Sequence, residues 1–198
     1  MANDLTLLIK QTIANCTDRV IWVAYSGGMD SHVLLHLLAS SQDLPCHRLK
    51  AIHIDHRLHD DSAQWAMHCA KVANTLGVDF QSIEVEVLNI DSMGLEAAAR
   101  MIRYQTIAEK LSTKDIVFTA QHQEDQAETL LIQLLRGSGP KGLSAMAPLS
   151  PIGKAQMMRP LLNTNQVDIK AYAEDHKLEW IDDPSNINNK FNRNYLRH

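Results

Sequence analysis

Short apolar runs and longer helical segments alternate along this chain, and the alternation constrains the fold more than any other feature. The run VIWVAY at 20–25 is almost continuously apolar, which is typical of a strand buried on both faces of a sheet. The segments between such runs carry apolar residues at helical spacing. This pattern predicts an α/β fold: an open, mainly parallel, twisted sheet with helices on both faces, as in Rossmann-like domains.

The apolar runs and the segments with helical spacing also predict where each strand and helix lies. The strands are expected at 20–25, 49–54, 80–87 and 115–120, and the helices at 31–40, 62–76, 94–111, 123–136 and 163–177. Gly77 and Gly137 follow two of these helices, and glycine readily adopts the left-handed conformation that ends a helix. An N-cap at Asn163 or Thr164 is expected to begin the last helix.

Two segments have no clear period. Residues 137–159 are rich in Gly, Pro and Ser, which predicts a long functional loop rather than a further strand and helix. Residues 178–183, with the sequence LEWIDD, are expected to form a last short strand.

The sequence SGGMDS at 26–31 joins the first strand to a helix that starts near Asp30. Ligands of an open parallel sheet bind beyond the carboxyl ends of its strands, and this segment lies there. Glycines let the backbone approach a ligand closely, and the amide groups at a helix start attract anions. On the residues alone, two interpretations stay open: a tight turn capped by Asp30, or a cradle for a phosphate group.

The presence of Asp30 and the absence of a lysine indicate which kind of phosphate-binding loop this segment could form. The segment has no GKS or GKT sequence, so it is not the P-loop whose lysine reaches the β- and γ-phosphates. A carboxylate inside a phosphate cradle repels the ligand unless a cation lies between them. Mg²⁺, held by one or two carboxylates and by phosphate oxygens, satisfies this requirement.

Several segments together resemble a known family. SGGMDS resembles the pyrophosphate-binding loop of the N-type ATP pyrophosphatases, which split ATP into AMP and pyrophosphate. The order and spacing of the other segments resemble the tRNA(Ile)-lysidine synthetases from the first strand onward. Those segments are HIDHRL at 53–58, GLEAAARMIRY at 94–104, TAQHQEDQAET at 119–129, RGSGPKGLSAM at 136–146, RPLL at 159–162 and residues 182–198.

The resemblance implies one PP-loop ATP pyrophosphatase domain over 1–198, with an adenine nucleotide alpha hydrolase-like fold. Its core is expected at about 18–185, and 186–198 are expected to start a helix that leads to a further C-terminal region.

The resemblance also implies the site residues. ATP and its pyrophosphate are expected on Ser26, Gly27, Gly28, Met29, Asp30, Ser31, Asp55 and His56. Asp30 and Asp125 are the expected Mg²⁺ ligands, and the expected catalytic residues are these two with Arg193 and Arg197. Contacts to phosphate, tRNA or substrate are expected from Glu96, Arg100, Arg103, His122, Glu128, Arg136 and Lys141. Relatives often have two adjacent histidines where this chain has Gln121 and His122, so the role of the first histidine is in question.

Each of these groups also has an ordinary structural interpretation. Glu96, Arg100 and Arg103 lie within about 60° on a helix, which also suits a surface ion pair. Acidic residues such as Asp125 in the first turn of a helix interact favourably with the helix dipole. Arg193 and Arg197 could belong to a solvated basic helix.

The implied reaction joins free L-lysine to cytidine 34 of the tRNA(Ile) with a CAU anticodon, using ATP and Mg²⁺. Two alternatives are another PP-loop enzyme such as a tRNA thiolase, and a module that binds ATP or AMP without chemistry. The chain has only three cysteines and no C-x-x-C pair, whereas thiolases commonly carry cysteine pairs. The net charge of -4 means that contacts to tRNA come from a local basic stripe or from a domain outside this chain.

Localisation and assembly are less constrained by the sequence. No apolar run approaches the roughly 20 residues that span a membrane, and the N-terminus lacks the features of a secretion signal. A cytoplasmic protein without a membrane partner is therefore expected. The sequence leaves open whether the protein assembles as a homodimer.

Overall fold

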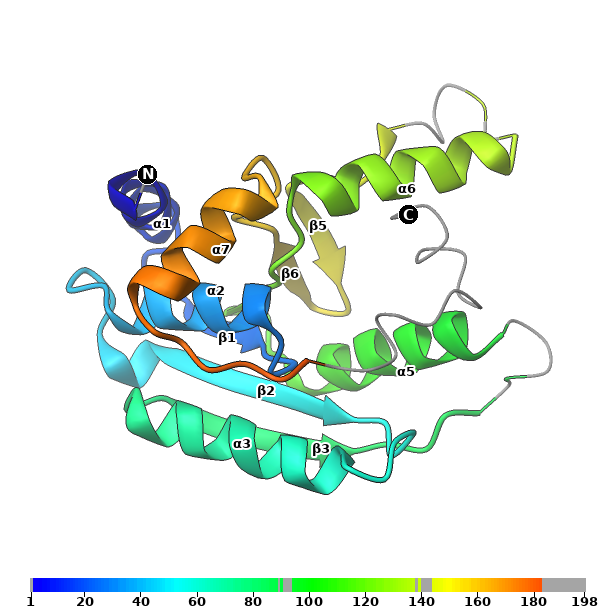
Figure 1. The fold of residues 1–198 in the computed structure, drawn as a ribbon, viewed down its shortest axis with the longest axis horizontal. Helices are drawn as coiled ribbons and strands as arrows, with labels where there is room; N and C mark the ends of the chain where they lie inside the picture. Colours follow the sequence, from blue (N-terminus) through cyan, green and yellow to red (C-terminus); the bar gives the residue numbers. More distant parts are fainter. Residues whose placement is uncertain (1, 89, 91–93, 138, 140–143, 183–198) are drawn as a thin grey trace.

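The strands of the computed structural model form one six-stranded sheet in the order β3-β2-β1-β4-β6-β5 (Figure 1). The structure describes residues 2–88, 90, 94–137, 139 and 144–182. The strands are β1 (Val20–Ala24), β2 (Leu49–Asp55), β3 (Asp79–Glu84), β4 (Asp115–Phe118), β5 (Leu149–Ile152) and β6 (Ala155–Met158). Neighbouring strands are parallel except β5 and β6, which confirms the predicted mainly parallel sheet.

Helices cover both faces of this sheet, as predicted. They are α1 (Ala2–Ala14), α2 (Met29–Ala39), the 3₁₀ turn η1 (Cys46–Arg48), α3 (Ser62–Thr75), α5 (Leu95–Lys110), α6 (Gln123–Leu135) and α7 (Gln166–Asp175). Ile21 and Val23 of β1 pack in one apolar cluster with α1, α2, α3 and α7. Trp22 lies between them in sequence and packs on the opposite face, against α5. In the described ranges, none of the helices is long and apolar enough to cross a bilayer.

The strand order places a crevice beside β1. The chain runs outward from β1 through β2 to β3, and then crosses to β4 on the other side of β1. The connections therefore leave the carboxyl ends of β1 and β4 in opposite directions. Such a reversal is where open α/β sheets bind their ligands.

Part of the predicted loop at 137–159 is a β-hairpin, so that prediction was wrong for residues 149–158. β5 and β6 pair antiparallel through a turn at Gly153 and Lys154, and β6 then pairs parallel with β4. Gly153 has a φ of 53°, a conformation that glycine adopts without strain. The alternation of Ala155 and Met157, both buried, with the half-buried Gln156 and Met158 is the signal that could have revealed the hairpin.

Three smaller differences between the prediction and the structure concern a strand, a helix cap and a helix. Residues 178–182 form no strand; β1 is flanked by β2 and β4, so no free sheet edge lies beside them, and the N–H of Ile181 bonds to the Gly27 carbonyl in the loop after β1. α7 is capped by Asn165, whose side chain accepts from the N–H of Asp168, and not by Asn163 or Thr164. Helix α1 was not predicted.

Candidate active site

A cavity of about 790 Å³ lies where the carboxyl ends of β1 and β4 meet. Seven parts of the chain line it: the end of β1 with the loop after it, β2, α5, the segment from β4 into α6, Met146, the first half of α7, and 180–182. The polar lining includes Ser26, Asp30, Ser31, Arg100, Arg103, Gln121, Glu124, Asp125, Gln166 and Lys170. Both the position and the volume suit a nucleotide-sized ligand.

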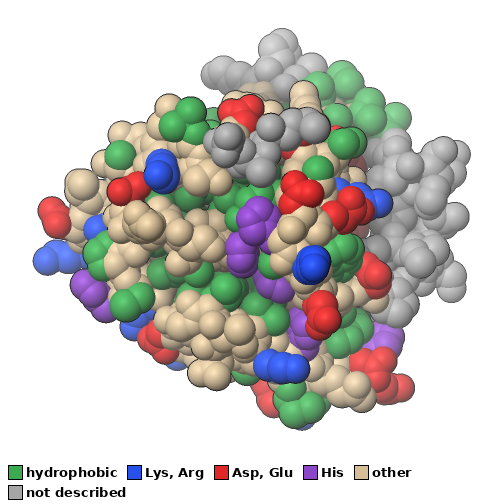
Figure 2. Space-filling view, turned by 60° about the vertical axis from the view of Figure 1, so that its left-hand side comes forward, with side chains coloured by type: hydrophobic (Ala, Val, Ile, Leu, Met, Phe, Trp, Pro, Cys, Tyr) green, Lys and Arg blue, Asp and Glu red, His purple; other side chains and the backbone are tan. Residues whose placement is uncertain are grey.

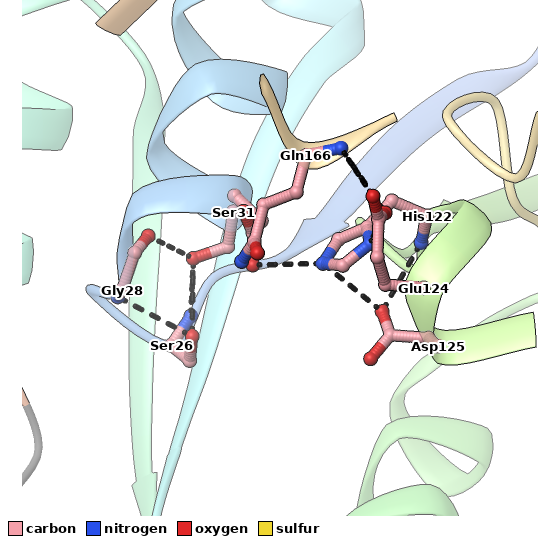
Figure 3. Close-up of polar contacts among 8 residues, drawn as sticks. Ser26, Gly28, Ser31, His122, Glu124, Asp125 and Gln166 are labelled. Carbon is pink, nitrogen blue, oxygen red and sulfur yellow. Dashed lines mark hydrogen bonds and ion pairs between the residues drawn. The ribbon is translucent and has the colours of Figure 1, made fainter. Parts of the chain in front are cut away.

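The loop after β1 is shaped by hydrogen bonds among its own serines (Figure 3). Ser31 Oγ donates to the Gly28 carbonyl at 3.0 Å and accepts from the Ser26 N–H at 3.2 Å. The two serine hydroxyls are 3.1 Å apart, and the Gly28 N–H lies 3.4 Å from Ser26 Oγ. The N-cap of α2 is Gly28 and no side chain caps the helix, so Asp30 is not the cap that the turn interpretation requires. The uncapped amides of this first turn are suited to bind an anion.

Gly27 is the position of this loop where only glycine fits. Its φ is 87°, and a Cβ there would lie 2.6 Å from Ile181 Cδ1 and 2.9 Å from Cys69 Sγ. Burial raises the pKa of the Cys69 thiol to about 12, so this neighbour is an uncharged packing group rather than a thiolate. The loop is thus held against α3 and 180–182 with no room for a side chain.

We expect Gly27→Ala to lower the free energy of unfolding more than Gly77→Ala does. Gly77 has a φ of 68° and nothing within 4 Å of its Cβ position, so alanine there tests backbone strain alone, about 1–2 kcal/mol. The contacts at Gly27 add a packing cost of about 1–3 kcal/mol. Urea denaturation of the two variants measures the difference. Equal losses would show that the loop relaxes away from Ile181 and Cys69.

A buried histidine joins the two predicted Mg²⁺ ligands (Figure 3). His122 Nε2 lies 3.5 Å from Asp30 Oδ2 and 3.5 Å from Asp125 Oδ2, so the two carboxylate oxygens are at most twice that distance apart. His122 Nδ1 lies 2.9 Å from Glu124 Oε2. The structure thus brings Asp30 and Asp125 together as predicted, and it assigns His122 a place between them that sequence reasoning missed.

The charges around His122 favour its protonated form. Burial alone would lower the pKa of His122, but the hydrogen bond to Asp30 and the negative charges of Asp125 and Asp30 outweigh burial and raise it. The contact with Glu124 acts in the same direction.

The same carboxylates fit a magnesium ion. Asp30 Oδ1 is buried and has no hydrogen-bond partner in the described part of the chain. A carboxylate oxygen without a donor costs free energy when buried, and a cation would satisfy it. Two carboxylates beside a phosphate site are the ligand set that Mg²⁺ accepts together with phosphate oxygens.

The start of α6 explains why His122 and Asp125 adopt these positions. The His122 N–H donates to Asp125 Oδ2 at 3.1 Å, which forms half of a capping box at the helix start. The spacing of three residues between them is the sequence signal for this cap. Besides its contact with His122, Glu124 accepts from the backbone N–H of Gln166 at 3.0 and 3.1 Å, which ties α6 to α7.

Gln121, where the family resemblance leads to the expectation of a histidine, lines the cavity. Its Oε1 accepts a hydrogen bond from the Thr119 hydroxyl. An amide can hold this contact, but it cannot exchange a proton as a histidine could.

Two arginines of α5 form the opposite wall. Arg100 stacks over Tyr104, with its Cζ 5.0 Å from the ring centroid. Arg103 donates to His56 Nε2 at 3.3 Å. Burial, followed by the charge of Arg103, lowers the pKa of His56 to about 4, so His56 accepts this bond as a neutral ring. Both arginines line the cavity, and their contact with phosphate, tRNA or substrate stays a prediction.

Several other predicted residues are not part of the described lining of the cavity. These are Gly27, Asp55, His56, Glu96, His122, Glu128 and Arg136. Asp55 is buried and accepts from the Arg57 N–H at 2.8 Å, so it shapes the turn after β2. Arg136 follows α6 and lies about 16 Å along the helix from Asp125. Lys141, Arg193 and Arg197 lie outside the described residues.

The cavity also contains a cation that sequence reasoning missed. Lys170 of α7 lines it, with a Nζ that lies 3.8 Å from Glu174 Oε1 at a largely exposed site. No local motif marks this lysine, because α7 reaches the cavity only through the tertiary fold.

We expect the stability of the chain to fall as the pH drops below about 6.5, in part because of His53. His53 is 7% exposed, its Nδ1 donates to the Tyr25 carbonyl, and burial lowers its pKa. As the pH falls, the unfolded chain then binds a proton that the folded chain does not bind. The free energy of unfolding therefore falls by up to about 1.4 kcal/mol for each pH unit. Urea denaturation from pH 7.5 to 5 should show a shallower slope for His53→Gln, which keeps a donor for Tyr25. The exposed His47 supplies the control, because His47→Gln should leave the slope unchanged; an unchanged slope in both variants would contradict the prediction.

The fold and the site define a class of protein. An open α/β sheet with a serine- and glycine-rich loop at its switch point, opposite two carboxylates, is a nucleotide-binding domain. The PP-loop domain family matches residues 1–198, the whole chain, and the chain belongs to this family.

The most similar relatives that we compared are longer proteins. The tRNA(Ile)-lysidine synthase of Alkalilimnicola ehrlichii is 47% identical over 179 residues, covering 89% of this chain and 40% of the relative. The tRNA(Ile)-lysidine synthase of Pseudomonas syringae pv. tomato is 42% identical over 199 residues, covering 98% of this chain and 44% of the relative. The chain therefore spans about two fifths of the length of these relatives.

Solved structures with the same fold are more distant in sequence. The U34-tRNA thiolase NcsA from Methanococcus maripaludis has a TM-score of 0.77 at 16% identity, covering 98% of this chain and 69% of that one. The NMN synthetase from Francisella tularensis has a TM-score of 0.61 at 13% identity, and the match covers 90% of this chain and 70% of the synthetase. At these identities the similarity shows the fold alone, in agreement with the predicted adenine nucleotide alpha hydrolase-like sheet.

Proposed function

We propose that this chain is the catalytic domain of a tRNA(Ile)-lysidine synthase, which uses ATP to join free L-lysine to cytidine 34 of the tRNA with a CAU anticodon. The observation that carries the proposal is the pairing of Asp30 with Asp125 beside the uncapped start of α2. The curated relatives with this name, at 42–47% identity, support the choice of reaction within the PP-loop family.

In the first step, the cytidine O2 attacks the α-phosphorus of ATP. An O–P bond forms, the bond to the β-phosphate breaks, and pyrophosphate leaves. The amides of the loop at 26–31 and the positive end of α2 would hold the departing pyrophosphate. Mg²⁺ on Asp30 and Asp125 would neutralise negative charge that develops on the phosphate oxygens.

In the second step, an amine of free lysine attacks the activated carbon. A C–N bond forms, the C–O bond to AMP breaks, and the amine loses its proton. The acidic first turn of α6 offers carboxylates that suit a positively charged amino acid, and Glu128 is buried one turn further along. We therefore infer that the lysine approaches the cavity from the side of α6.

The basic residues of the cavity suit a polyanionic substrate. Arg100 and Arg103 on α5 and Lys170 on α7 all line the cavity. Elsewhere Lys and Arg side chains are scattered among acidic ones on the face shown in Figure 2. With a net charge of -4, most phosphate contacts to a tRNA would then come from these cavity residues and from regions that the longer relatives possess. A reaction on tRNA with ATP is expected in the cytoplasm.

The thiolase alternative is less well supported. Cys16, Cys46 and Cys69 lie on separate parts of the fold, and Cys16 and Cys69 are buried. A module that only binds ATP or AMP would have no need for the paired carboxylates.

The proposal is tested by labelling two tRNAs that differ only at position 34. Radioactive lysine, with ATP and Mg²⁺, should be incorporated into the tRNA with C34 and not into its C34→U variant, because the attacking group belongs to cytidine. The uncharged C34→U transcript controls for non-specific retention of lysine. Equal incorporation into both tRNAs, or ATP-dependent sulfur transfer instead, would overturn the proposal.

A further inference from the structure

Residues 144–148 lie beside α6 and are fixed to it by two glutamine side chains. Gln126 Nε2 donates to the Met146 carbonyl at 2.8 Å, and Gln126 Oε1 accepts from the Met146 N–H at 2.7 Å. Gln133, about two turns further along α6, accepts from the Ala145 N–H at 3.2 Å. We call residues 144–148 the wall segment, because Met146 lines the cavity.

A buried arginine holds the other end of the wall segment. Arg159 is 8% exposed, and its guanidinium donates to the Ala147 carbonyl at 2.6 Å and to Ser150 Oγ at 3.1 Å. The backbone N–H of Arg159 donates to the Pro148 carbonyl at 2.9 Å. If the wall segment moved away, a buried charge would lose one of its acceptors, and this would cost free energy.

The backbone of the wall segment is strained at Ala145. Its φ is 51°, in the left-handed region that residues with a Cβ rarely adopt. Such a conformation persists only where the surrounding structure holds it, and it is frequent at ligand sites. The bonds from Gln133 to Ala145 and from Gln126 to Met146 provide this support. The wall segment is therefore a fixed side of the cavity.

Met146 is the residue through which this arrangement reaches a substrate, because Gln126 and Arg159 are not part of the described lining. A thioether is apolar and polarisable, so it suits the face of an aromatic ring better than a charged group. Ala147 and Pro148 are exposed, which places the wall segment at the rim of the cavity. A cavity of about 790 Å³ leaves most of a tRNA outside, so the tRNA is the substrate that stays in contact with this rim.

We propose that Gln126 is a positioning residue, which fixes Met146 against the pyrimidine ring of the cytidine that enters the cavity. The inference rests on the proposed function, because it takes the tRNA as a substrate. The phosphates of ATP are assigned to the start of α2, whereas the wall segment is fixed to α6. Free lysine offers no aromatic ring to a thioether. The contact with Met146 therefore distinguishes the tRNA from the other two substrates.

The first test measures rates of lysine incorporation while tRNA, ATP and lysine are varied in turn. Gln126→Leu keeps the approximate size of the side chain and removes both bonds to Met146. The KM for the tRNA should then rise at least about 10-fold, while the KM values for ATP and lysine stay within about twofold. Gln105→Leu, at an exposed position of α5 where the amide bonds only to Glu109, is the matched control and should change none of the three constants.

Substitutions of Met146 separate positioning from a general loss of structure. Met146→Ala should raise the KM for the tRNA as Gln126→Leu does, and Met146→Leu should keep most of the affinity because it keeps an apolar side chain of similar size. If Gln126 acts through Met146, the double variant Gln126→Leu and Met146→Ala should bind the tRNA no more weakly than Met146→Ala alone. A KM that rises by the product of the two single effects would overturn the inference.

The second test needs binding and no turnover. In a chain with ¹³C-labelled methionine methyl groups, the Met146 resonance is the one that Met146→Leu removes. It should shift when an RNA stem–loop with a CAU anticodon is added, and it should stay in place when ATP or lysine is added alone. In Gln126→Leu the same RNA should shift it less.

The two tests fail in different ways. A Met146 methyl group that does not respond to an excess of the RNA, or that responds to ATP or lysine instead, would overturn the inference. A KM for ATP or lysine that rises as much as the KM for the tRNA would overturn it as well. If the unaltered chain joins no lysine to the C34 tRNA, the proposed function fails, and the methyl measurement still decides whether Met146 contacts the RNA.

Discussion

Asp30→Asn is expected to reduce the rate of lysine- and tRNA-dependent pyrophosphate release about 10³-fold, equivalent to roughly 4 kcal/mol of transition-state stabilisation. Asp30 lines the cavity, its Oδ2 contacts His122, and its Oδ1 has no protein partner in the described ranges. Removing its charge weakens the attraction for Mg²⁺, so the residual activity should require a higher Mg²⁺ concentration. Initial rates over a range of MgCl₂ concentrations measure both effects.

The same substitution should leave the fold intact. An asparagine oxygen can still accept a hydrogen bond from His122, so the thermal midpoint should stay within a few degrees of that of the unaltered chain. Asp43→Asn, at an exposed acidic position, controls for the loss of one negative charge. Normal pyrophosphate release by Asp30→Asn with unchanged Mg²⁺ dependence would show that this carboxylate does not hold the metal.

The sequence predicts the centre of the fold well because burial leaves a strong pattern there. β1 and β4 are covered on both faces, so their apolar runs could be located within a residue or two. Gly77 follows α3 with a φ of 68° and Gly137 follows α6 with a φ of 69°, as expected of glycines that end helices. The sheet class then follows from the order of these elements.

The sequence predicts the edges of the fold less well. β5 and β6 are only four residues each, and β5 contains Pro151, which weakens any strand prediction. Their pairing depends on β4, more than thirty residues earlier, and no local signal shows that contact. Trp180 and Ile181 line the cavity, and Ile181 lies against Gly27, so these apolar side chains do not indicate a strand of the sheet.

The site shows the same division between local and tertiary information. The loop at 26–31 and the acidic start of α6 are local sequences, and both lie where the sequence predicts. Helical spacing identifies which residues share a face, but it does not give their distance from a ligand. Glu96 and Arg136 illustrate this, because each shares a helix with a residue of the lining and neither belongs to it. Lys170 reaches the cavity from a helix with no recognisable motif.

Asp125 has two functions that a pair of substitutions can separate, and its loss is the second large effect that we expect. Its carboxylate faces Asp30 across His122, and it also accepts the His122 N–H that begins α6. Asp125→Asn keeps an oxygen for the cap and removes the charge, so pyrophosphate release should fall about 10²- to 10³-fold with little loss of stability. Asp125→Ala removes both and should lower the free energy of unfolding by about 1 kcal/mol as well.

Combining Asp125→Asn with Asp30→Asn tests whether the two carboxylates act as one unit. If both hold the same ion, the double variant should be only slightly slower than the slower single variant, because either substitution alone already removes the site. Rates that fall by the product of the two single effects would instead indicate independent roles. That outcome would restrict the metal site to one carboxylate and leave Asp125 as the residue that positions His122.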